Sequence, residues 1–193
     1  GSIGKPLRPA RSAVELVEGV PVPKEVELSL ADFKHLRDST DILHSERLMM
    51  ARQIASVYKK HDAFVILHGT DSLAETAAAF CMFFKSTLQK PLFIIGAQMS
   101  KDEPGSEAIF QLSNTFRVAS AFHRNNVVGV YNVCIGDVWD GSRLRKRSES
   151  NFNAFYTPGR YPVARVWPNI HFDEGLRYQD PVLAVQDVRI DAA

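Results

Sequence analysis

The stretch from Phe64 to Ser72 restricts the possible folds of this chain more than any other, because an apolar run there passes directly into a compact polar turn. The run Phe64–Leu67 has the composition of a strand that is buried on both faces. Gly69 permits a tight exit from that strand, and a helical pattern starts at Ser72. In open α/β sheets ligands bind at the carboxyl ends of strands, so Thr70 and Asp71 are candidate site residues. The alternative is that this turn is an ordinary helix cap.

The same order of strand, turn and helix recurs along the chain. Apolar runs predict strands at 64–67, 92–95 and 127–133, and helical spacing of apolar residues predicts helices at 45–60, 72–88 and 106–124. Strands that alternate with helices imply right-handed crossovers between parallel neighbours. We therefore predict an α/β fold, a three-layer sandwich with a mostly parallel sheet. The units are too few for an eightfold barrel.

The remaining segments carry weaker patterns. Ser12 and Glu15 form a plausible capping box for a short helix at 12–18, and alternating charged and apolar residues predict a strand at 25–30. Residues 137–141 have the composition of a turn. Short β patterns at 163–167 and 183–190 predict an edge hairpin or a linker.

Charge and cysteine usage exclude several classes of protein. The formal net charge of the 193 residues is +1, which gives no reason to expect binding to nucleic acid or to a membrane surface. No apolar run approaches the roughly 20 residues that span a bilayer. Cys81 and Cys134 both lie in apolar stretches and are expected to be reduced thiols, which favours a cytoplasmic location.

Metal and nucleotide sites have no support in the residue spacing. The six histidines occur singly, without a His-x-x-x-His or Cys-x-x-Cys pair, and the glycines form no phosphate-binding loop. Lys146 is a candidate base, because a desolvated lysine that is oriented by a carboxylate can take a proton from a hydroxyl. The alternative is that Lys146 is one more exposed cation in the run 143–147.

Several motifs, taken in order, are similar to those of the bacterial-type L-asparaginase family. They are His68-Gly69-Thr70-Asp71-Ser72 after an apolar strand, Lys90-Pro91 before a strand that runs into Gly96-Ala97-Gln98, Asp38-Ser39-Thr40-Asp41 before a helix, Ser106 and Asn114 in a third helix, and Asp140-Gly141 followed by Lys146. The resemblance covers about residues 6–178. It is most specific at the turn around Thr70.

The resemblance implies a Thr70–Asp71–Lys146 triad. Lys146, held by Asp71, would then deprotonate Thr70 or a water. It also implies that Ser39 and Thr40 hold the α-amino and carboxylate groups of an asparagine-like substrate, and that the carbonyl of Ala97 receives the amide. Hydrolysis would pass through an acyl-enzyme and release aspartate and ammonia, with no cofactor. Glutamine, or a glutaminyl group presented to a tRNA amidotransferase, is the nearest alternative substrate.

The chain also departs from the family pattern. The family's primary nucleophile is a threonine in a Thr-Gly-Gly-Thr-Ile stretch on a first strand that is missing here, and Gly1-Ser2-Ile3-Gly4 is either a remnant of that motif or a cloning scar. Met99, Glu107 and Gln111 stand where arginine, aspartate and asparagine are usual. We expect residues 1–178 to form the family's N-terminal domain and 179–193 a linker or terminal strand, with the second domain absent.

The resemblance implies a homo-oligomer, a dimer or tetramer, because the family's second domain contributes to a neighbouring subunit's site. The alternatives to an amidohydrolase are a non-catalytic module for binding or assembly and a fragment of a larger enzyme.

Overall fold

The computed structural model describes residues 12–33 and 39–173 of the chain. Ser2, Asp38 and the strand predicted at 183–190 lie outside the described residues, as does the proposed linker at 179–193. The α-helices are α1 (Ala13–Val17), α2 (His44–Val57), α3 (Leu73–Phe84) and α4 (Ala108–Arg124). Single 3₁₀ turns occupy Ser39–Asp41, Tyr58–Lys60, Lys85–Thr87 and Gly141–Arg143. The strands are β1 (Phe64–Leu67), β2 (Pro91–Ile95), β3 (Gly129–Cys134), β4 (Asp137–Asp140), β5 (Arg145–Lys146), β6 (Phe155–Tyr156), β7 (Ala164–Val166) and β8 (Ile170–Phe172).

Six of these strands form one sheet with the order β1-β2-β3-β4-β7-β8. The pairs β1–β2 and β2–β3 are parallel, and they contain the three strands that hydrophobic runs predict. The pairs β3–β4, β4–β7 and β7–β8 are antiparallel, so the sheet is mixed. Strands β5 and β6 pair separately as a small antiparallel ribbon. The predicted α/β class is confirmed.

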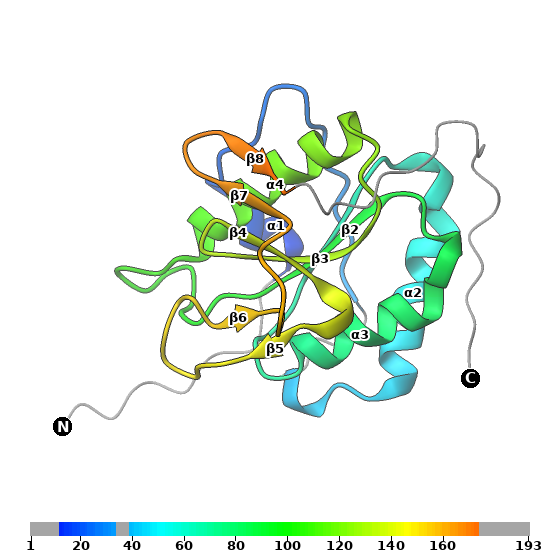
Figure 1. Ribbon diagram of the computed structural model, residues 1–193, viewed down its shortest axis with the longest axis horizontal. Coiled ribbons are helices and arrows are strands. Elements are labelled where there is room, and N and C mark those ends of the chain that lie inside the picture. The colour runs from blue at the N-terminus through cyan, green and yellow to red at the C-terminus, as the bar shows by residue number, and fades with distance from the viewer. Residues whose placement is uncertain (1–11, 34–38, 174–193) are drawn as a thin grey trace.

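Alternate side chains of the parallel strands enter two different cores. Leu92 and Ile94 of β2 pack in one core with buried residues of α2 and α3, whereas Phe93 and Ile95 pack on the opposite face with residues of α4. Figure 1 shows the sheet between these two groups of helices. This arrangement is the predicted three-layer sandwich, and it explains why β2 is apolar at every position.

Two local predictions are wrong. Residues 25–30 form no strand, because this segment packs beside a helix instead of a sheet edge: the Glu25 carboxylate accepts hydrogen bonds from Ser120 and Arg124 of α4. Residues 137–140 form strand β4, where a turn was predicted. The turn lies earlier, at Ile135 and Gly136, which both have positive φ, as a two-residue type I′ hairpin requires.

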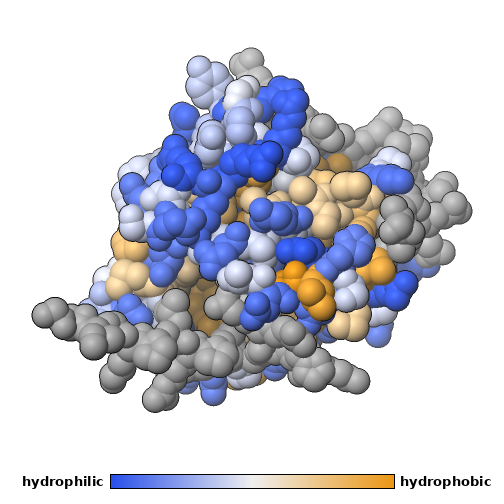
Figure 2. Space-filling model, turned by 90° about the horizontal axis from the view of Figure 1, so that it is seen from below, coloured by the Kyte–Doolittle hydropathy of each residue, from blue (hydrophilic) through white to orange (hydrophobic). Residues whose placement is uncertain are grey.

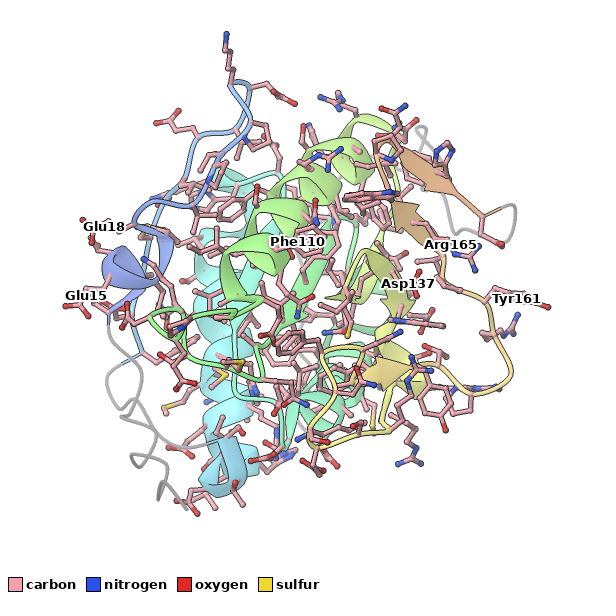
Figure 3. All side chains as sticks on the ribbon, turned by 90° about the vertical axis from the view of Figure 1, so that its left-hand side faces the viewer. Glu15, Glu18, Phe110, Asp137, Tyr161 and Arg165 are labelled. Carbon is pink, nitrogen blue, oxygen red and sulfur yellow. The ribbon has the colours of Figure 1, made fainter. Side chains whose placement is uncertain are left out.

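An ion pair as well as backbone hydrogen bonds connects strands β4 and β7 in the antiparallel half of the sheet. Asp137 of β4 lies opposite Arg165 of β7, and Arg165 Nε is 3.5 Å from Asp137 Oδ1. Burial raises the pKa of Asp137, and the positive charge of Arg165 acts against that rise. Figure 3 shows these two side chains on adjacent strands, with Tyr161 extending outward beyond them.

Candidate active site

Two neighbouring parallel strands deliver the central residues of the site. Thr70 and Asp71 follow β1, and the segment 96–98 follows β2, so both lie at the same edge of the sheet. The two segments are in close contact, because a Cβ atom added to Gly96 would lie 2.6 Å from the backbone oxygen of His68 and 3.2 Å from the methyl group of Thr70. Only glycine fits at position 96 without a shift of this contact.

Lys146 reaches the same place from the β5–β6 ribbon. Its Nζ lies 2.7 Å from Asp71 Oδ1 and 3.1 Å from Thr70 Oγ1. The Lys146 side chain is only 11% exposed, compared with 52% for Asp71. The Lys146 side chain is therefore largely shielded from solvent and its ammonium group faces both residues, which is inconsistent with a merely exposed cation in a basic run. Figure 1 shows β5 beside the start of α3, where Asp71 and Ser72 lie.

The 3₁₀ turn Ser39–Asp41 is hydrogen-bonded to the loop that contains Thr70 and Asp71. Ser39 is 4% exposed, and its hydroxyl oxygen accepts a hydrogen bond of 3.3 Å from the backbone N–H of Asp71. Thr40 donates to Asp71 Oδ2 at 3.3 Å. Ser72 stands at the N-cap position of α3, but its hydroxyl donates to the backbone oxygen of Ser39 and does not cap the helix. In this state Ser39 therefore orients the Asp71 backbone.

Gln98 is a site residue that was not predicted. Of the motif Gly96-Ala97-Gln98, only the carbonyl of Ala97 was expected to contact the substrate. Thr70 Oγ1 donates to Gln98 Oε1 at 3.1 Å. The Gln98 backbone N–H donates to the buried carboxylate of Glu107, whose second oxygen is buried without a hydrogen-bond partner. The strand end itself gave a signal for Gln98, because the polar side chains that closely follow a buried parallel strand lie at the ligand edge of the sheet.

Gln111 of α4 fixes the end of β2 relative to the β3–β4 hairpin. Its side-chain amide donates to the Gly96 carbonyl at 2.8 Å and accepts from the Ile135 N–H at 2.8 Å. Asn114, which the motif comparison also selected, accepts a hydrogen bond from Arg117 one turn along the helix. Gln111 therefore stabilises the backbone at the site, whereas Asn114 contacts its own helix.

His68 forms a second hydrogen-bonded network behind the site. Its Nδ1 lies 2.7 Å from the Gly69 carbonyl, and its Nε2 lies 3.0 Å from the Thr76 hydroxyl, which accepts from Arg47 Nε at 2.9 Å. A neutral ring that carries its hydrogen on Nδ1 satisfies all three contacts. Burial lowers the pKa of His68, so the ring is held in this neutral form.

Opposing influences set the protonation of Lys146. Burial lowers the pKa of its ammonium group, but hydrogen bonds and charge from Asp71 and Glu149 outweigh burial, and the pKa lies above its ordinary value. Glu149 was not predicted as a site residue, because it lies in a polar loop and no spacing links it to the turn at Thr70. Its carboxylate is in direct contact with Lys146 Nζ.

No cluster of three or more histidine, cysteine or carboxylate side chains with the geometry of a metal site occurs within 12–33 and 39–173. In the same part of the chain no helix has both the length and the apolar character that a bilayer crossing needs. Figure 2, which views the molecule of Figure 1 from below, shows hydrophilic residues interspersed with several hydrophobic patches.

Comparison with known proteins agrees with this geometry. The family described as "Asparaginase, N-terminal" matches residues 2–177. A glutamyl-tRNA(Gln) amidotransferase subunit from Pyrococcus horikoshii is 31% identical over 93% of this chain and 42% of its own length. L-asparaginase 1 from Escherichia coli K12 is 31% identical over 73% of this chain and 40% of its own length.

Solved structures show the same fold. L-asparaginase I from Vibrio cholerae superposes with a TM-score of 0.69 at 28% identity, over 86% of this chain and 46% of that one. The thermostable L-asparaginase from Thermococcus kodakarensis gives a TM-score of 0.73 at 25% identity, over 86% of this chain and 49% of that one. The chain thus spans less than half the length of these relatives. Together, the ordered motifs, the fold and the family match show that this chain belongs to the asparaginase family, to whose N-terminal region it corresponds.

Proposed function

We propose that this chain is the N-terminal part of an asparaginase-type amidohydrolase that hydrolyses the side-chain amide of L-asparagine. The observation that carries the proposal is the position of Lys146 Nζ, which lies within hydrogen-bonding distance of both the Thr70 hydroxyl and the Asp71 carboxylate, on a side chain that is only 11% exposed. A hydroxyl, a base and an orienting carboxylate are the parts that nucleophilic amide hydrolysis needs.

The proposed roles follow the chemistry of each group. Lys146, once it is neutral, takes a proton from Thr70 or from a water, and Asp71 orients the lysine and stabilises the ammonium that forms. Attack of the Thr70 oxygen on the amide carbon gives a tetrahedral intermediate. The amide nitrogen then takes a proton from the Lys146 ammonium and leaves as ammonia, and water hydrolyses the acyl-enzyme. No step in this scheme requires a cofactor.

Substrate contacts are proposed for three further residues. Thr40 is exposed beside Asp71 and offers a hydroxyl to the polar groups of the amino acid. Ser39 would have to exchange its present bond to the Asp71 backbone for a bond to substrate. Ala97 is the second residue after β2, next to Gln98, and its carbonyl would accept from the amide nitrogen.

Ammonia release from L-asparagine by the complete natural gene product tests the proposal. We expect Thr70→Ala to lower the rate at least about 100-fold and Thr70→Ser, which keeps a hydroxyl, to retain a substantial part of it. Thr87→Ala is a matched control, since the hydroxyl of this threonine donates to the carbonyl of Phe84 at the far end of α3 and not to a residue of the site. Equal rates for the wild type and Thr70→Ala would exclude the proposed role.

Glutamine is a second candidate substrate, and the similarity to the amidotransferase subunit favours it specifically. The same residues would act on an amide that is one methylene farther from the amino acid backbone. Parallel assays with L-asparagine and L-glutamine separate the two candidates, because the ratio of their kcat/KM values measures the preference directly.

A further inference from the structure

The ε-amino group of Lys146 has three polar neighbours, and only two of them belong to the Thr70–Asp71–Lys146 arrangement. The third is Glu149, whose carboxylate contacts Lys146 Nζ directly. A lysine ammonium has three hydrogens to donate, so Thr70, Asp71 and Glu149 together use all of them. The resting site therefore contains a fully bonded ammonium between two carboxylates.

The hydrogen bonds at Thr70 run in the direction opposite to the one catalysis needs. Thr70 accepts from Lys146 and donates its own hydrogen to Gln98 Oε1. The Gln98 amide is fixed in this orientation, because its nitrogen donates at 3.2 Å to the backbone carbonyls of Ser148 and Asn151. No proton can pass from Thr70 to Lys146 until the lysine loses one of its own.

Glu149 and the two carbonyls that hold Gln98 lie in one segment, residues 148–151, between β5 and β6. The Glu149 side chain is 79% exposed, whereas Lys146 is 11% exposed. Glu149 thus reaches from the surface to the inner site, where its carboxylate contacts Lys146 Nζ.

We propose that Glu149 is a positioning residue that, together with Asp71, holds the ε-nitrogen of Lys146 so that its third bonding position faces Thr70. When Lys146 is neutral, its two remaining hydrogens are directed to Asp71 and Glu149, and its lone pair points to Thr70. The Thr70 hydroxyl then turns from Gln98 to Lys146. Its proton moves to Nζ and restores the ammonium. The electron pair of Oγ1 forms the bond to the amide carbon, and the π electrons of the amide carbonyl move to its oxygen.

The same geometry predicts a pH signature. The charged groups that face Lys146 in the described part of the chain are Asp71, at the start of α3, and Glu149, on the loop that follows β5. Both carboxylates favour the ammonium, so removing the charge of Glu149 allows Lys146 to become neutral at lower pH. The acidic limb of the kcat/KM profile, where the neutral lysine is scarce, then moves to lower pH.

Two substitutions of Glu149 separate the effect of its negative charge from the effect of the hydrogen bond that orients Lys146 Nζ. Glu149→Gln keeps an oxygen that accepts the N–H of Lys146 but removes the charge, so we expect an acidic limb at lower pH, a roughly two- to fivefold higher kcat/KM on that limb, and an unchanged plateau. Glu149→Ala removes both the charge and the hydrogen-bond acceptor. We therefore expect the acidic limb to move to lower pH by the same amount and the plateau of kcat/KM to be lower than in the wild type. Glu27→Gln is the matched control, because Glu27 is exposed and lies in the segment that packs near α4.

This inference rests on the proposed amidohydrolase function, and the experiment distinguishes the failure of each. The pH profile of ammonia release is measured with the complete gene product, and the titration of Lys146 is followed independently by NMR of its ε-methylene group. An acidic limb and a Lys146 titration at lower pH in Glu149→Gln support the inference. Profiles and titrations that match the wild type overturn it, even if Lys146→Met is inactive. Full activity of Lys146→Met overturns the proposed function, and the NMR titration then decides the inference about Glu149 alone.

Discussion

Gly69→Ala is expected to destabilise the protein by forcing the 3₁₀ turn at Ser39 away from the loop that carries Thr70. A Cβ atom at position 69 would lie 2.5 Å from Ser39 Oγ and 2.7 Å from Ser39 Cβ. The backbone itself accepts alanine, because Gly69 is not among the residues with positive φ. Ser39 is 4% exposed and therefore has little room to move.

The size of the effect can be worked out from these contacts. Overpacking at a tight site costs about 1–3 kcal/mol. Displacing Ser39 also breaks its bond to the Asp71 N–H, which contributes about 0.5–1.5 kcal/mol. We therefore expect Gly69→Ala to lower the free energy of unfolding by about 2–4 kcal/mol in urea denaturation followed by circular dichroism.

A double-mutant cycle tests the cause. Ser39→Gly removes both atoms that the new Cβ would meet, so Gly69→Ala should cost about 1–3 kcal/mol less in that background than in the wild type. If the two substitutions are additive to within about 0.5 kcal/mol, the contact between Gly69 and Ser39 does not limit stability and the reasoning is refuted.

Other predictions concern the buried histidine and the core. Because burial lowers the pKa of His68 from 6.5, the unfolded chain binds its proton more readily, so the stability from the neutral ring is complete above about pH 6.5 and is lost as pH falls toward the folded pKa. Unfolding of His68→Asn measured against pH should show a weaker loss of stability on that side. Leu92→Ala, at a fully buried position between α2, α3 and the sheet, should cost about 2–5 kcal/mol. Arg124→Ala, which removes an exposed ion pair with Glu25, should leave the denaturation midpoint in the same assay close to that of the wild type.

The parallel half of the sheet could be predicted from the sequence because β1 and β2 carry apolar side chains on both faces. The runs at Phe64–Leu67 and Pro91–Ile95 are apolar at consecutive positions, and each ends in a polar turn. Local composition is sufficient to identify these strands, since a strand with apolar side chains on both faces forms an uninterrupted hydrophobic run.

The antiparallel half was less predictable. Strand β4 begins and ends with Asp137 and Asp140, which favour turns, and only Val138 and Trp139 between them are buried. The true turn includes Ile135 at a φ of 46°, a conformation that a β-branched residue rarely adopts. Residues 25–30 alternate like a strand, but whether an extended segment finds a strand partner depends on tertiary contacts that local sequence does not encode.

The residues of the candidate site that lie within recognised motifs could be selected from the sequence. Thr70, Asp71 and Lys146 are brought together, although 75 residues separate Asp71 from Lys146. Gln98 and Glu149 were missed for different reasons. Gln98 lies within a recognised motif, whereas Glu149 reaches Lys146 only because the loop between β5 and β6 turns back over the site.

The most direct test of the central claim compares Lys146→Met with Arg145→Met in the complete gene product. The two residues are adjacent on β5 and each substitution removes one positive charge, but Arg145 is exposed and Lys146 contacts Thr70 and Asp71. We predict that Lys146→Met lowers kcat/KM for ammonia release from L-asparagine by about 10²–10⁴-fold, whereas Arg145→Met stays within about threefold of the wild type. Equal activity of the two variants would contradict the claim that Lys146 acts at this site.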